Sequence, residues 1–133
     1  MNASVMTDAA IVRRNPDLPG APEDARAEAI ALAVMNAGTM AEDSLAPDAA
    51  WERSGAPCTL GRAAIMAAIG RGSAPRKIYV EQVVSQGKAA TVSGRVIGAD
   101  GGARLYCHVI RYTASSAQQV AQIVSFEHSV KVR

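Results

Sequence analysis

The chain has 133 residues and a formal net charge of +2, from 14 basic and 12 acidic side chains. This length fits a single domain, and the near balance of charge argues against nucleic-acid binding, which would concentrate lysine and arginine on one face. Only 4% of the residues are aromatic. A core of small side chains buries little apolar area per residue, so we expect modest stability alone and some reliance on a subunit interface.

The N-terminal residues contain neither a basic segment nor an apolar run of signal-peptide length. No stretch of the sequence approaches the length of a membrane span. The two cysteines, Cys58 and Cys107, fall in segments of different character, which is a poor basis for a disulfide framework. We therefore expect two free thiols in a cytoplasmic protein that has no membrane partner.

The first part of the chain predicts an arm followed by a helix. Proline and glycine interrupt any periodic pattern within residues 1–22, which we expect to form an N-terminal arm or a short helix. From residue 23 onward apolar side chains recur at helical spacing, and Gly38 stands where a glycine commonly caps a helix. We expect residues 23–133 to form the single domain.

Two further helices are predicted in the middle of the chain. Thr39 and Glu42 have the spacing of a capping box, which would begin a short second helix that ends at Pro47. A third helix is predicted over 62–70, where apolar residues share one side and glycines follow. A short segment centred on Trp51 lies between the two.

From residue 78 the apolar pattern alternates as it does in β-strands. Turn residues separate four such runs, at 78–85, 89–97, 104–113 and 119–130. Their short connections predict consecutive hairpins and an antiparallel meander. Helices first and strands afterwards is the order of an α+β fold. We expect N-terminal helices packed into a curved antiparallel β-sheet that closes off an internal pocket.

Five stretches resemble, in order and spacing, the nuclear transport factor 2-like superfamily, which includes ketosteroid isomerases and SnoaL-like polyketide cyclases. They are residues 35–38, 46–52, 61–65, 109–112 and the final strand. The resemblance covers about residues 24 to 130 and implies a cone-shaped, cystatin-like fold with a pocket for a small molecule. It also implies a homodimer formed through the convex face of the sheet. A cystatin-like domain without a pocket has the same element order and is the alternative.

The catalytic groups of the ketosteroid isomerases are not retained. The resemblance places their tyrosine donor at Ala31, their carboxylate near Arg53 and their aspartate donor at His108. Ala31 has no donor, and Glu52, which precedes Arg53, should face the other way. Two of the three roles are lost, so we do not expect a ketosteroid isomerase.

A polar set nevertheless remains within the predicted pocket. His108 shares a strand face with Tyr106 and Ile110, and the resemblance turns Ile123, Ser125 and Glu127 into the cone. We predict His108 and Glu127 as proton-handling catalytic residues, because a nearby carboxylate favours the charged form of a histidine. The predicted ligand-binding residues are Arg53, Trp51, Tyr106, Ile110, Ile123 and Ser125.

Two alternatives apply to this pair. His108 has no catalytic role if it only donates a hydrogen bond to a backbone carbonyl or to Glu127. If the face of the last strand is shifted by one residue, Glu127 is a solvated edge residue and His128 takes the inner position.

Two functions remain open at this point. The first is a cofactor-independent isomerase, cyclase or dehydratase acting on a small apolar carbonyl or hydroxy compound, which Arg53 would orient. The second is a non-catalytic ligand-binding or dimerisation module. No metal site is predicted, because the cysteines and histidines lack paired ligand spacing. The predicted residues of the dimer interface are Val120, Val124 and Phe126.

Overall fold

The computed structural model describes residues 9–18, 20–114 and 119–130. Its elements in chain order are β1 (Ile11–Arg14), α1 (Pro22–Val34), the 3₁₀ turn η2 (Glu42–Ser44), β2 (Leu45–Arg53), β3 (Thr59–Leu60), α2 (Arg62–Gly70), β4 (Lys77–Gln86), β5 (Ala89–Ile97), β6 (Ala103–Tyr112) and β7 (Val120–Ser129). The helices precede the four long strands of the C-terminal half, as the sequence pattern predicts.

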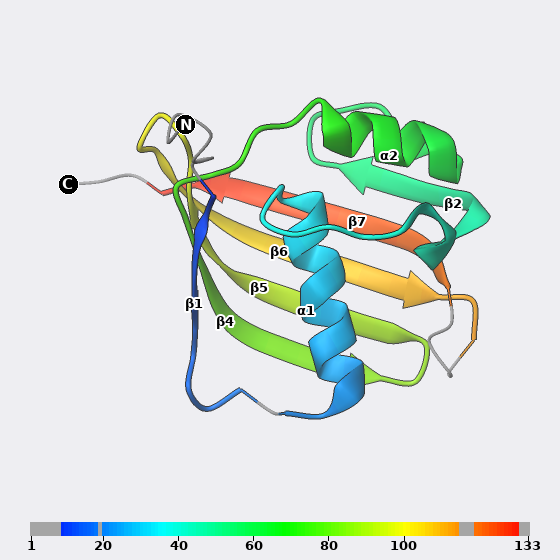
Figure 1. Ribbon diagram of the computed structural model, residues 1–133, viewed down its shortest axis with the longest axis horizontal. Helices are drawn as coiled ribbons and strands as arrows, with labels where there is room; N and C mark the ends of the chain where they lie inside the picture. The colour runs from blue at the N-terminus through cyan, green and yellow to red at the C-terminus, as the bar shows by residue number, and fades with distance from the viewer. Residues whose placement is uncertain (1–8, 19, 115–118, 131–133) are drawn as a thin grey trace, which may run out of the picture.

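All the strands belong to one curved, unclosed sheet with the order β1-β4-β5-β6-β7-β2-β3 (Figure 1). The antiparallel meander predicted over β4 to β7 is confirmed. Outside the meander the sheet is mixed, which the sequence pattern did not predict, because β1 pairs with β4 and β2 pairs with β7 in parallel. Apolar alternation marks a strand but carries no information on the direction of its partner.

Helix α1 crosses the concave face of this sheet, where it packs against β4 and β5 (Figure 1). Its inward face includes Ala27 and Ala31, both 0% exposed, with Ile30 and Val34 beside them. Small side chains at these positions let the helix backbone lie close to the sheet. Ala31, which has no hydrogen-bond donor, is therefore part of the tightly packed contact between helix and sheet.

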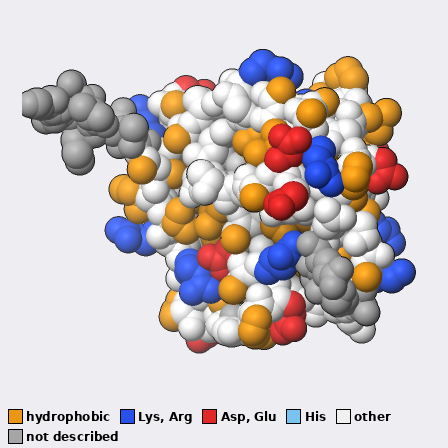
Figure 2. Space-filling model, turned by 45° about the vertical axis from the view of Figure 1, so that its right-hand side comes forward, with side chains coloured by type: hydrophobic (Ala, Val, Ile, Leu, Met, Phe, Trp, Pro, Cys, Tyr) orange, Lys and Arg blue, Asp and Glu red, His pale blue; other side chains and the backbone are white. Residues whose placement is uncertain are grey.

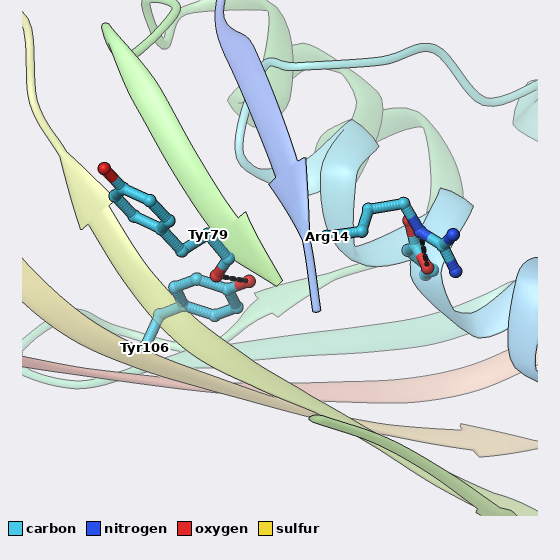
Figure 3. Close-up of polar contacts among 4 residues, drawn as sticks. Arg14, Tyr79 and Tyr106 are labelled. Atoms are coloured by element: carbon cyan, nitrogen blue, oxygen red, sulfur yellow. Dashed lines mark hydrogen bonds and ion pairs between the residues drawn. The ribbon is translucent and has the colours of Figure 1, made fainter. Parts of the chain in front are cut away.

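Residues 11–14 form β1 instead of the expected arm or short helix. The strand adds to the edge of the sheet beside β4, and Arg14 Nε donates to Glu28 Oε2 of α1 at 2.7 Å (Figure 3). Glu28 is 8% exposed, so its carboxylate needs such a partner. This ion pair joins β1 to α1. Local sequence patterns could not predict it, because the two residues are far apart in the sequence.

The second predicted helix is wrong. Only the single turn η2 forms, without a side-chain cap, and β2 begins at once and continues through Pro47. Pro47 is exposed and lies where the register between β2 and β7 shifts, so its missing N–H removes no ladder hydrogen bond. A proline read as the end of a helix is thus part of a strand irregularity.

A bulge and a glycine bend the sheet between β4 and β5. The register shifts between Val80 and Gln82, opposite Gly94. A Cβ on Gly94 would lie 1.9 Å from the carbonyl oxygen of Tyr79, and that oxygen accepts a 2.9 Å hydrogen bond from the Tyr106 hydroxyl (Figure 3). Bulges and strand glycines are the usual sources of such curvature, which here makes the concave face that holds α1.

A second bulge changes which residues of β7 face inward. The register with β6 shifts between Arg111 and Tyr112, so that Tyr112 pairs with Val120. Val120 is consequently 0% exposed, and its predicted place in a dimer interface is wrong. Phe126 is 52% exposed and Val124 is partly buried, and both remain on the outer face.

Acidic and basic side chains are interspersed on the face of the molecule shown in Figure 2. In the described part of the chain, none of the helices has the length and apolar character that a membrane span requires. Cys58 and Cys107 are both free, with Cys58 exposed and Cys107 partly buried.

Candidate functional site

A cavity of about 270 Å³ lies among α1, the end of β2 and the two strands β6 and β7. Five of the predicted site residues line it: Trp51, Arg53, His108, Ser125 and Glu127. Val34 and Met35 add apolar surface. The volume is near the lower end for small-molecule pockets, so the cavity suits a small metabolite.

Three predicted ligand-binding residues do not line this cavity. Ile110 and Ile123 are 0% exposed, and Tyr106 is 3% exposed, and all three belong to the hydrophobic core. All three lie on the inner face of the sheet, as predicted. They lie in the part of that face that the hydrophobic core covers. Ser54 and Ala56 complete the cavity wall and were missed, because they belong to a loop whose path has no periodic signal.

Adjacent strands align the polar residues in one row across the sheet. Arg53 of β2 is paired with Ser125 of β7, and Ser125 is paired in turn with His108 of β6. Trp51 lies two residues before Arg53 and therefore faces the same side. The parallel pairing of β2 with β7 thus creates the site, although these strands are far apart in sequence.

A chain of hydrogen bonds orients the histidine ring. Trp51 Nε1 donates to Ser125 Oγ at 2.9 Å, and Ser125 Oγ lies 2.7 Å from His108 Nδ1. Ser125 Oγ, which already accepts from Trp51, either donates its own hydrogen to Nδ1 or accepts a second hydrogen bond from an Nδ1–H. The opposite tautomer would leave the hydroxyl hydrogen without an acceptor among the described residues. We therefore assign the neutral tautomer that carries its hydrogen on Nε2.

The environment of His108 keeps the ring neutral. The residue is 2% exposed, and burial lowers the pKa of His108 to about 4. The Nε2 atom is buried and has no hydrogen-bond partner among the described residues. A neutral imidazole with one nitrogen held by Ser125 therefore retains one unsatisfied N–H donor.

Glu127 lines the same cavity but does not pair with His108. Its side chain is 42% exposed, and its Oε1 accepts a 2.7 Å hydrogen bond from Arg104 Nε. Glu127 lies two residue pairs further along the strands than the pair of His108 and Ser125. The expectation that a carboxylate would raise the pKa of His108 is wrong, since burial lowers it.

The inward face predicted for the last strand is correct around Ser125, which is 7% exposed. Beyond it, the four residues from Phe126 to Ser129 are all exposed, including His128. The alternative register that would turn His128 inward is therefore wrong. Glu127 is exposed because the end of β7 extends past the buried part of the concave face.

Arg53 lies at the wall of the cavity with its guanidinium 4.4 Å from the centre of the Trp51 ring. Its Nη2 makes one long contact of 3.4 Å with Thr59 Oγ1. Its Nε is buried and without a hydrogen-bond partner in the described part of the chain. The stacking on Trp51 fixes the plane of the guanidinium and leaves donors along its edge.

A second, more open cavity of about 420 Å³ shares Val34, Met35 and Glu127 with the first. Residues 72–75 and 98–100 border it, together with Arg104. The ion pair between Arg104 and Glu127 thus stands where the two cavities adjoin. The sequence pattern predicted only turns at these positions.

No family model and no curated protein matches the sequence. Solved structures do match the fold. A candidate ketosteroid isomerase from Kribbella flavida aligns with a TM-score of 0.64 and 14% identity, over 83% of this chain and 80% of that chain. An NTF2-like protein of unknown function from Burkholderia xenovorans aligns with a TM-score of 0.62 and 14% identity, over 84% of each chain.

A third match is SalBIII, an epoxide hydrolase/cyclase-like enzyme with a role in pyran ring formation in the polyether salinomycin. It aligns with a TM-score of 0.55 and 15% identity, over 80% of this chain and 93% of that chain. At such identities the likeness concerns the fold and carries no assignment of activity. The resemblance found in the sequence is thereby confirmed at the level of architecture: this chain has the α+β cone of the nuclear transport factor 2-like proteins.

Proposed function

We propose that this protein binds a small carbonyl compound in the 270 Å³ cavity, with the Nε2–H of His108 donating a hydrogen bond to the carbonyl oxygen. The observation that carries the proposal is the state of the His108 ring. Ser125 holds Nδ1, whereas Nε2 is buried and unpartnered among the described residues. The ring is thus oriented by the protein and has one donor left for a ligand.

The energetics support the same role. A buried donor left without a partner costs about 1–3 kcal/mol, and a ligand oxygen at Nε2 would recover that amount. The low pKa of His108, about 4, keeps the donor uncharged near neutral pH. The cavity therefore favours a polar but uncharged acceptor at this point, such as a ketone or aldehyde oxygen.

The catalytic form of the proposal is a cofactor-independent isomerase, cyclase or dehydratase. A hydrogen bond to a carbonyl oxygen stabilises the negative charge that develops there when a neighbouring C–H loses its proton. Glu127 lines the same cavity and would accept that proton. The isomerase and cyclase names of two structural neighbours favour this class.

Two observations favour binding without catalysis as the second candidate function. Ala31 offers no second donor to the oxygen, and Glu127 is already engaged by Arg104. Both functions share the same ligand chemistry at His108. They differ only in whether Glu127 removes a proton.

The test is a titration with neutral ketones, acetone and butanone, followed by the fluorescence of Trp51, which is the chain's single tryptophan and lines the cavity. The Nε2 resonance of His108 in ¹⁵N NMR reports the hydrogen bond directly. Both signals should change on binding in the wild type. His108→Phe keeps a flat ring in the core but removes the donor, and it should weaken binding about tenfold.

His128→Phe is the matched control, since His128 is exposed and does not line this cavity. It should bind as the wild type does. If the Nε2 resonance of His108 in the wild type does not change even at the highest ketone concentrations, the proposal is refuted. Exchange of ketone α-hydrogens in D₂O then separates the two functions. Exchange that disappears in Glu127→Gln indicates catalysis, and binding without exchange indicates the non-catalytic function.

A further inference from the structure

We propose that the ligand of this cavity also carries a carboxylate, that Arg53 binds this carboxylate, and that the ligand class is therefore a small oxo acid. This inference rests on the proposed binding of a carbonyl oxygen at His108. It adds a second anchor, Arg53 of β2, which lies on the other side of β7 from His108.

The first support is the state of the Arg53 side chain. Its Nε is buried and has no hydrogen-bond partner among the described residues, although a guanidinium is always charged. The side chain as a whole is only partly buried, and a single buried donor without a partner carries a modest cost in free energy. Neither of the ion pairs found in the described part of the chain involves Arg53.

The second support is the charge that faces the cavity. Arg53 and Glu127 are the charged side chains in its wall, and Glu127 is already neutralised by Arg104. One positive charge therefore remains without a counterion. Because the guanidinium is stacked on Trp51, its fork is held in a fixed plane, which suits the two oxygens of a carboxylate.

The third support is the spacing of the two anchors. Arg53 and His108 are paired with the same residue, Ser125, on the strand between them. Neighbouring strands lie about 4.8 Å apart, so the backbones of the two anchors are roughly 10 Å apart on one face of the sheet. The cavity between them has a volume of about 270 Å³. A short molecule with an acceptor at each end fits these dimensions.

Both unpartnered groups are donors, and this defines the ligand chemistry. Nε2 of His108 is an uncharged donor and suits a carbonyl oxygen, whereas the guanidinium of Arg53 is a charged donor and suits a carboxylate. An amine or a simple cation would be repelled by Arg53 and would find no acceptor at either anchor. An oxo acid satisfies both.

The experiment compares two oxo acids, pyruvate and levulinate, with the ketones that lack their carboxylate, acetone and butanone. Propanoate and pentanoate are the matching acids without the carbonyl. Binding is followed by Trp51 fluorescence and by the Nε2 resonance of His108. In the wild type, at least one oxo acid should bind roughly tenfold to hundredfold more tightly than its ketone, which is the range of a hydrogen bond to a charged group.

Arg53→Gln should abolish this advantage, because it should lower the affinity for the oxo acid much more than the affinity for the ketone. Arg53→Lys keeps the charge without the fork and should retain part of the advantage. Arg111→Gln removes an exposed arginine of β6 and is the matched control, which should behave as the wild type. Circular dichroism and urea midpoints check that each variant is folded. If Arg53→Gln is unfolded, the comparison is made with Arg53→Lys.

The possible failures are distinguishable. Ketones that bind at His108 as tightly as their oxo acids, with no effect of either Arg53 variant, would overturn this inference and leave the proposed function standing. A wild type whose His108 Nε2 resonance responds to none of the carbonyl compounds would overturn both. An oxo acid advantage that survives Arg53→Gln would show that another group binds the carboxylate, which also overturns the inference.

Discussion

Lowering the pH should destabilise this protein through His108. Its pKa is lowered from 6.5 to about 4 by burial, whereas in the unfolded chain the ordinary value applies. Between these two values the unfolded state binds more protons than the folded state. The stabilising contribution of the neutral His108 is therefore fully present above pH 6.5, the unfolded pKa. It is lost as the pH falls toward about 4, the folded pKa.

The magnitude follows from the two pKa values. Between about pH 7.5 and about pH 5, the linkage relation gives a loss of roughly 2 kcal/mol in the free energy of unfolding. That is a large part of the stability expected for a domain of this size. Glu127 offers no compensation, because its carboxylate pairs with Arg104 instead of His108.

The assay is urea denaturation at both pH values for the wild type and for His108→Phe. The variant has no imidazole to protonate, so the pH dependence of its stability should be smaller by roughly 2 kcal/mol. Carboxylates elsewhere contribute equally to both proteins and cancel in the difference. His128→Gln, which removes the exposed second histidine, serves as the control and should retain the wild-type dependence. Equal pH dependence in the wild type and His108→Phe would refute the idea that His108 is buried in its neutral form.

Three further predictions concern the fold and its surface. Gly94→Ala should lower the free energy of unfolding by more than about 2 kcal/mol in urea denaturation, because its Cβ would meet the Tyr79 carbonyl, whereas Gly70→Ala, with open space around it, should not. Light scattering at micromolar concentration should show a homodimer that Phe126→Asp dissociates, because Phe126 is exposed on the outer face, and a monomeric wild type would contradict this. Both cysteines should titrate as free thiols, Cys58 faster than Cys107, because Cys107 is partly buried and burial raises its thiol pKa; equal rates in the folded state would contradict this order.

Much of the architecture could be predicted from local patterns. Period-two alternation marked the four long strands and hairpin turns marked their antiparallel pairing, because both signals lie within a few residues of each other. The third predicted helix agrees with α2, since apolar spacing and terminal glycines are also local. The prediction of the second helix was wrong. Thr39 and Glu42 have the spacing of a capping box, but the burial of Leu45 and Ala46 in β2 favours a strand.

The candidate site could be predicted only in part. Strand alternation showed which residues share a face with His108 and with Ser125. The resemblance to a known family turned these faces inward and brought Trp51 and Arg53 toward the same pocket. The supposed pair of His108 and Glu127 did not form, because alternation assigns a face but does not tell how far along the strand the covered region extends.

The sequence by itself determined α1, α2, the four long strands and the order of the meander, since each depends on neighbours within one helix, strand or hairpin. Only the tertiary structure decided the parallel pairing of β1 and β2, the two bulges and the depth at which each inward side chain lies. These depend on contacts between distant segments. The hydrogen bonds from Trp51 through Ser125 to His108 exist only because β2 lies beside β7, and burial of the ring then sets its charge.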